Sequence, residues 1–148
     1  MGGMKKMKIY KLEIKRMMIR ETEKVNANSP QAIAREFKKD FDSLDREHFK
    51  IIHLNTKNDI TGIETISIGS LNSSIVHPRE VFKSAIIQSS ASIICLHNHP
   101  SGDTKPSNAD IEVTQRLIKA GDILGIKVLD HLIIGEDKYL SMKEEGIL

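Results

Sequence analysis

Two histidines, His97 and His99, are separated by a single asparagine in the stretch LHNHPSGDTKPSNAD, which runs from Leu96 to Asp110. In an extended strand, side chains two residues apart point to the same face, and their Cα atoms are separated by about 6–7 Å. His97 and His99, at the end of a strand, would therefore present both imidazoles to one side. Two such rings can converge on one Zn²⁺ ion, to which histidine nitrogens bind at about 2.0–2.1 Å.

The loop after the histidines leads to a candidate third ligand. Ser107 and Asp110 are three residues apart at the start of the next predicted helix, on neighbouring positions of its surface. The helix dipole favours an ionised carboxylate at this end of a helix. Two histidines and Asp110 would leave a fourth position for a water molecule, whose pKa falls towards neutrality beside zinc.

Each part of this pattern also has a purely structural explanation. The run SNAD is nearly a capping box, in which Ser107 and Asp110 would satisfy free backbone groups of the helix. A lone His-x-His pair is more often incidental than metal-binding. The combination of same-face histidines, a constrained loop and a polar pair at a helix start strengthens the metal interpretation, but the residues alone leave both interpretations open.

The elements around the loop follow from the hydrophobic pattern. Residues 91–99 (ASIICLHNH) are nearly all apolar, which is typical of a strand buried on both faces, and residues 126–135 predict a second such strand. Between them, residues 106–125 predict a helix that ends at Gly121 or Gly125. The candidate ligands therefore lie where a buried strand meets a helix.

The upstream chain adds further elements. An alternating pattern in KIYKLEIKRMMI, residues 8–19, predicts a first strand. Residues 26–41 predict a helix with Ser29 as its N-cap and Pro30 in its first turn. Two strands joined by a turn at TKND follow in residues 48–70, and residues 77–90 predict another helix. This order predicts an α/β or α+β protein with a central mixed sheet, closed by a terminal hairpin or tail.

Composition excludes several classes of protein. The 148 residues are 39% hydrophobic and 28% charged, as expected for one globular domain, which we assign to residues 29–148. No apolar run approaches the roughly 18 residues that a membrane span needs. The single cysteine, Cys95, excludes an internal disulfide framework, and the N-terminus does not resemble a secretion signal. We therefore expect a cytoplasmic protein.

Residues 1–28 are predicted to form a basic arm. Residues 1–24 hold eight Lys/Arg and three Glu, a net charge of +5, whereas the rest of the chain carries −3. Such an arm could bind nucleic acid by neutralising phosphates. The alternative, lysines that discourage an edge strand from pairing with other chains, is favoured because the body has no basic excess and few aromatic residues to stack on bases.

The run HNHPSGDTKPSNAD resembles the His-x-His and Ser-x-x-Asp pattern of MPN/JAMM metalloproteases. With LNSSIVHPREVFKSAI and LGIKVLDHLIIG, it resembles the bacterial RadC family over about residues 45–148, whereas the first 45 residues do not resemble the helix-hairpin-helix segment of longer RadC-type proteins. The resemblance implies a three-layer α/β/α, cytidine-deaminase-like JAB/MPN domain around a mixed β-sheet. It assigns zinc to His97, His99 and Asp110, and transition-state support to Ser107.

The family also uses an upstream glutamate as general base. Its place in family members points to Glu47 in DREHFKIIHLN, with Glu80 in HPRE as the runner-up. Each carboxylate has a structural alternative: Glu47 as a solvated side chain in a charged run, and Glu80 as a first-turn residue that favours its helix dipole.

The resemblance implies a zinc-dependent hydrolase that cleaves a peptide or isopeptide bond of an unknown protein substrate. Glu47 would act first as base and then as acid, while the Ser107 hydroxyl would bind the developing oxyanion. Two other functions remain open: a DNA-repair-associated protein that binds or processes nucleic acid, and a non-catalytic metal-binding scaffold. We expect no membrane association and leave a homodimer open.

Two further polar residues are predicted to lie near this site. His131, in the strand of residues 126–135, could orient the metal ligands, although a core histidine with satisfied hydrogen bonds is the more frequent case. Cys95 alternates onto the same face as His97, and we expect it to be a small buried hydrophobe.

Overall fold

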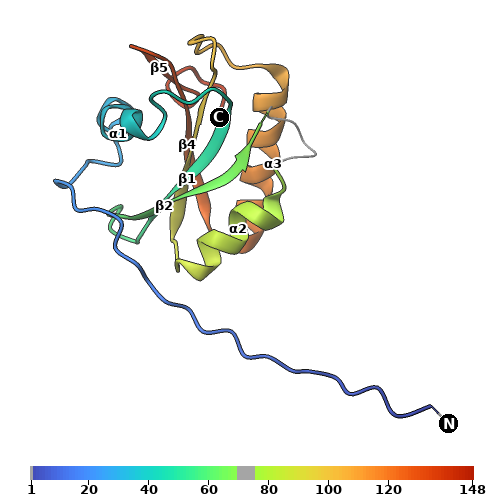
Figure 1. The fold of residues 1–148 in the computed structure, drawn as a ribbon. Helices are drawn as coiled ribbons and strands as arrows, with labels where there is room; N and C mark the ends of the chain where they lie inside the picture. Colours follow the sequence, from blue (N-terminus) through green and yellow to red (C-terminus); the bar gives the residue numbers. More distant parts are fainter. Residues whose placement is uncertain (1, 70–75) are drawn as a thin grey trace.

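The computed structural model describes residues 2–69 and 76–148, and within them the chain forms a five-stranded mixed sheet between helices (Figure 1). The strands are β1 His48–Leu54, β2 Ile60–Ile68, β3 Ser92–Asn98, β4 Lys127–Ile134 and β5 Tyr139–Ser141. They are ordered β2-β1-β3-β4-β5. The pair β3 and β4 is parallel, and the other neighbouring pairs are antiparallel. The central strand β3 is buried at every position.

Helices cover both faces of this sheet. They are α1 Pro30–Phe37, which continues into a 3₁₀ turn, α2 Pro78–Ile87 and α3 Asn108–Leu124. Figure 1 shows α1 on one face and α2 and α3 on the other. Alternate residues of β3 join two separate apolar clusters: Ile93 and Cys95 contribute to one, Ile94 and Leu96 to the other. The predicted three-layer α/β/α architecture is confirmed.

Local signals in the sequence explain where the helices begin and end. The Ser29 hydroxyl accepts a hydrogen bond from the backbone N–H of Ala32 at 3.2 Å, and Pro30 occupies the first turn of α1, as predicted. Helix α3 ends at Leu124 and is capped by Gly125, whose φ of 72° is the left-handed conformation that glycine adopts without strain. Of the two glycines that the sequence offered, Gly125 is therefore the one that caps the helix.

The predicted first strand in residues 8–19 is wrong. Residues 2–29 form no helix or strand, and the N-terminal segment extends away from the sheet (Figure 1). Its apolar side chains Ile9, Leu12 and Ile14 are 92%, 81% and 59% exposed. A strand is stable only when a neighbour pairs with its backbone and a layer covers its apolar face, and this segment has neither. The predicted boundary at residue 28 stays a prediction.

The last residues, 137–148, were predicted to form a short hairpin or tail, and in the structure they contribute one short strand, β5, followed by turns. Strand β5 pairs with the end of β4, where Ile134 lies opposite Tyr139. Among the described residues, no helix has the length and apolar character that crossing a membrane requires.

Candidate metal centre

The candidate ligands meet where β3 ends and α3 begins. His97 is the second-to-last residue of β3, and His99 directly follows the strand. Asp110 lies in the first turn of α3. The Nε2 atoms of His97 and His99 are 2.9 Å apart. The Asp110 carboxylate places Oδ1 3.4 Å from His97 Nε2 and Oδ2 3.2 Å from His99 Nε2. The two Nε2 atoms and the carboxylate of Asp110 thus lie close together.

These separations fit a small metal ion. With ligand bonds of about 2.0–2.1 Å, the ligand atoms of a tetrahedral zinc site lie about 3.3 Å from one another. The three residues form a group whose ligand atoms all lie within 4.8 Å of one another, and the side chains of His97 and Asp110 are almost fully buried. The set of two imidazoles and one carboxylate could bind a metal ion, and it suits zinc among other divalent metals.

The same aspartate also completes the capping box of α3. Its Oδ2 accepts a hydrogen bond from the backbone N–H of Ser107 at 2.7 Å, and the Ser107 hydroxyl accepts one from the N–H of Asp110 at 3.1 Å. The structural and the metal-binding interpretations of SNAD are therefore compatible, because the cap fixes the carboxylate that faces both histidines. A hydroxyl that accepts one bond still has its own hydrogen to donate.

Electrostatics keep this carboxylate ionised. Burial pushes the pKa of Asp110 upward, but the interactions of its carboxylate with the rings of His97 and His99 and with the Ser107 amide outweigh burial and hold the pKa well below its usual range. The hydrogen bond to Asp110 raises the pKa of His99 against the opposing effect of burial. A buried anion between two imidazoles is an environment that favours a bound cation.

The loop after β3 fixes the ring of His99. Nδ1 of His99 lies 2.7 Å from the backbone carbonyl oxygen of Asp103, which can only accept, so Nδ1 carries the hydrogen. In the neutral ring, the lone pair is then on Nε2, the atom that faces Asp110. Gly135 permits this loop to pack closely, since a Cβ there would lie 2.8 Å from the carbonyl oxygen of Gly102.

Behind His97 lies His131 of β4. Nδ1 of His97 is 2.6 Å from Nε2 of His131, and Nδ1 of His131 is 2.5 Å from the hydroxyl of Thr114 in α3. Burial lowers the pKa of His131 well below its ordinary value. His131 is thus a core histidine with both ring nitrogens hydrogen-bonded, and one of its partners is a candidate ligand.

Glu47 is held beside the cluster by Asn98. The Asn98 side chain accepts a hydrogen bond from the N–H of His48 at 2.8 Å and donates one to the carbonyl of Arg46 at 3.0 Å, so it grips the backbone on both sides of Glu47. The charge of Glu47 contributes to the raised pKa of His99. The sequence does not indicate this contact, because nothing local shows which distant backbone an amide side chain will meet.

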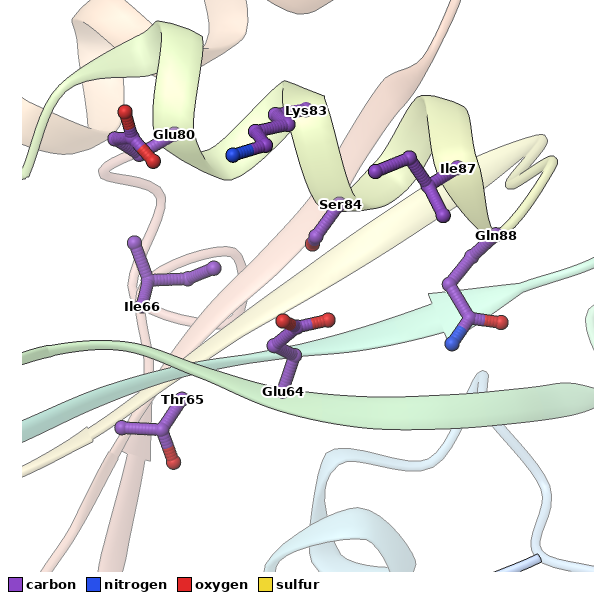
Figure 2. A pocket seen from close by; sticks show the side chains of 8 residues that line it. All are labelled: Glu64, Thr65, Ile66, Glu80, Lys83, Ser84, Ile87 and Gln88. Carbon is purple, nitrogen blue, oxygen red and sulfur yellow. The ribbon is translucent and has the colours of Figure 1, made fainter. Parts of the chain in front are cut away.

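The structure places Glu80 elsewhere. It lines a cavity of about 200 Å³ between α2 and β2, together with Glu64, Lys83 and Ser84 (Figure 2). Cys95 is fully buried in the apolar cluster that faces α2 and α3, and burial raises the pKa of its thiol. Of the two candidate glutamates, Glu47 lies within electrostatic reach of His99.

A mixed sheet between helices, with a buried His-His-Asp cluster at the end of its central strand, defines an α/β protein with a candidate metal centre. The family model of the RadC-like JAB domain matches residues 27–147, and the chain therefore belongs to the RadC-like JAB domain family. This result confirms the resemblance to the RadC family that the sequence motifs carry.

Similar proteins occur in several bacteria. A UPF0758 protein of Desulfitobacterium hafniense (strain DSM 10664 / DCB-2) is 60% identical over 121 residues, which cover 82% of this chain and 53% of that protein. A UPF0758 protein of Caldanaerobacter subterraneus is 56% identical over 130 residues, covering 88% and 56%. One of Bacillus cereus (strain AH187) is 54% identical over 140 residues, covering 93% and 62%. The chain thus spans about half to three-fifths of the length of these relatives, whose name states no activity.

Proposed function

We propose that this chain is a zinc-dependent hydrolase of the RadC/JAMM type that cleaves a peptide or isopeptide bond. The observation that carries the proposal is the convergence of the candidate ligands. The Nε2 atoms of His97 and His99 are 2.9 Å apart, and the two carboxylate oxygens of Asp110 lie 3.4 Å and 3.2 Å from them. The match to the RadC-like JAB domain supports the same chemistry. The buried single cysteine is compatible with a reducing compartment, and we propose the cytoplasm.

The residues around the cluster have distinct roles in the proposed reaction. A zinc ion held by His97, His99 and Asp110 would supply Lewis-acid chemistry that polarises the scissile carbonyl and activates a water molecule. Glu47 accepts the proton of the attacking water and delivers it to the leaving nitrogen as the C–N bond breaks. Ser107 donates its hydroxyl hydrogen to the oxyanion that develops on the carbonyl.

Metal content and hydrolysis together test this proposal. We expect near-stoichiometric zinc in the purified wild type and a loss of zinc in His99→Ala, because two remaining ligands bind zinc weakly. Glu47→Gln should keep its zinc but lose hydrolysis of peptide and isopeptide substrates by several orders of magnitude. Glu80→Gln is the matched control and should retain both.

The outcomes separate the alternatives. A wild type without zinc under metal-replete conditions would refute the hydrolase. Stoichiometric zinc without hydrolysis of any tested peptide or isopeptide substrate would favour a metal-binding scaffold. Loss of activity in Glu80→Gln but not in Glu47→Gln would exchange the roles of the two glutamates.

A second candidate function is nucleic-acid binding through the N-terminal arm. Six Lys/Arg side chains precede Arg20, and all six are exposed. If the arm binds DNA, affinity should fall steeply with salt concentration, and deletion of residues 1–24 should abolish binding. Equal DNA binding by the full and the shortened chain would reject this role of the arm.

A further inference from the structure

We propose that Thr114 and His131 are positioning residues that fix the tautomer of His97, so that the Nε2 lone pair of His97 faces the metal site. Three hydrogen bonds connect α3, β4 and β3 in one buried chain from the carbonyl of Asp110 to the ring of His97. The inference rests on metal binding in the proposed function and is independent of hydrolysis.

The direction of the chain is set at its Asp110 end. The hydroxyl of Thr114 lies 2.7 Å from the backbone carbonyl oxygen of Asp110, and a carbonyl oxygen can only accept. The hydroxyl has one hydrogen, which this bond uses. The more distant sulfur of Met142, at 3.6 Å, is a weak acceptor and does not compete. The oxygen of Thr114 must then accept from Nδ1–H of His131.

The direction then passes from His131 to His97. A neutral imidazole with a hydrogen on Nδ1 has its lone pair on Nε2, so His131 accepts at Nε2. Its partner there is Nδ1 of His97, 2.6 Å away, which must donate. His97 therefore carries its hydrogen on Nδ1 and presents the lone pair of Nε2 to Asp110 and His99. This tautomer is the one that can bind a metal through Nε2.

The neutral state of His131 follows from its surroundings. The ring is fully buried, and its two nitrogens meet the ring of His97 and the hydroxyl of Thr114, both without formal charge in the proposed chain. The adjacent Asp130 uses its carboxylate elsewhere: it accepts hydrogen bonds from the Ser141 hydroxyl and from the backbone N–H groups of His131 and Lys143.

The chain also explains why one helix serves two purposes. Asp110 and Thr114 are four residues apart in α3, so they lie on the same face of the helix. The side chain of Asp110 is a candidate ligand, while its carbonyl orients the hydroxyl of Thr114. The first two turns of α3 therefore supply one ligand and determine the tautomer of another.

The tautomers can be measured directly in the metal-free protein. Long-range ¹H–¹⁵N NMR correlations of the imidazole rings distinguish a hydrogen on Nδ1 from one on Nε2. In the wild type we expect both His97 and His131 to carry it on Nδ1. A hydrogen on Nε2 of His97 would overturn the inference, whatever the protein hydrolyses.

Metal affinity provides the second test, with Zn²⁺ alone as the probe in competition with a chelator. Thr114→Val keeps the shape of the side chain and removes the hydroxyl, so His97 should populate the wrong tautomer and zinc affinity should fall about 10–100-fold. Thr114→Ser restores the hydroxyl and should stay within about threefold of wild type by the same reasoning.

A control variant separates positioning from a general loss of stability. His53 is fully buried like His131, but it contacts Ser84 and Ser90 instead of the candidate ligands. His53→Gln should lower the unfolding temperature and leave zinc affinity unchanged. Zinc affinity in Thr114→Val equal to that of the wild type, or an equal loss in His53→Gln, would refute the inference. If the wild type binds no zinc, the proposed function fails, while the NMR measurement still tests the tautomers.

Discussion

The carboxylate of Asp110 contacts both the helix cap and the candidate metal ligands. Its Oδ2 atom accepts a hydrogen bond from the backbone N–H of Ser107 and also lies 3.2 Å from Nε2 of His99. A helix cap usually serves stability alone, whereas here it fixes the distance between a carboxylate and two imidazoles. The cap therefore holds the carboxylate in the conformation in which it could bind a metal together with both imidazoles.

Ser107 combines the same two roles, and its variants can separate them. Ser107→Ala removes the N-cap acceptor, which should lower the free energy of unfolding by about 1 kcal/mol. It also removes the proposed oxyanion donor, which should lower kcat by about 10²–10³. Ser107→Thr keeps a hydroxyl and should restore much of both. Urea unfolding and steady-state kinetics measure the two effects, and normal kcat in Ser107→Ala would exclude the oxyanion role.

His53 should make stability depend on pH. Burial lowers its pKa to about 4 in the folded chain, against 6.5 in the unfolded chain. Because the unfolded state binds the proton first, the contribution of His53 is full above pH 6.5 and is lost as pH falls towards 4. The difference corresponds to about 3 kcal/mol.

Urea unfolding between pH 7 and pH 4 measures this loss. His53→Gln has no titrating ring, so its free energy of unfolding should fall less over the same range. Parallel curves for the two proteins would show that His53 does not titrate as inferred.

The ends of the strands decide which side chains reach the metal centre. In the antiparallel pairing of β1 and β3, Phe49 lies opposite His97. Extending this register by two residues would put Glu47 opposite His99, in agreement with the effect of the Glu47 charge on the pKa of His99. Beyond Phe49 and His97, the side chain of Asn98 replaces the backbone of β3 as the hydrogen-bonding partner of the segment before β1.

Asn98→Ala should therefore affect Glu47 and spare the metal. Without the amide, the backbone around Glu47 loses both of its contacts with Asn98, and displacement of a reacting group by about 1 Å can cost about 10²-fold in rate. We expect kcat to fall by roughly that factor, with zinc content close to that of wild type. Metal analysis and kinetics on the same preparation check this, and a variant that loses its zinc would contradict the assigned role.

Across the whole molecule, the ordered body and the N-terminal arm differ in what they contribute. Arg20 forms ion pairs with Glu36 and Asp40, and Lys24 forms one with Asp59. The last residues of the arm therefore contact the body of the protein. The Arg20 pairs are partly buried and the Lys24 side chain is exposed, and ion pairs at the protein surface contribute about 0–1 kcal/mol each. The two apolar clusters on the faces of the sheet therefore account for most of the stability.

Deletion of residues 2–13 should leave the body intact. These residues are exposed and form no helix or strand, so the free energy of unfolding should change by less than about 0.5 kcal/mol. Zinc content should also be unchanged. Thermal unfolding and metal analysis of the shortened chain check both expectations, and a large drop in unfolding temperature would mean that the arm packs on the body in solution.

Features of short range were predictable from the residues. The N-cap Ser29, the near capping box at Ser107, the buried character of β3 and the same-face histidines each depend on neighbours within about four positions, where backbone geometry fixes the spacing. The interpretation of SNAD remained divided because one local pattern serves both a cap and a ligand.

Features of long range required the folded chain. Fifty residues separate His48 from Asn98, and 34 separate His97 from His131. Their contacts depend on which strands pair and in which register, since β3 pairs antiparallel with β1 and parallel with β4. In residues 8–19 the local pattern was misleading. Its alternation is typical of a strand, but a strand forms only where another strand pairs with it and an apolar layer covers its apolar face.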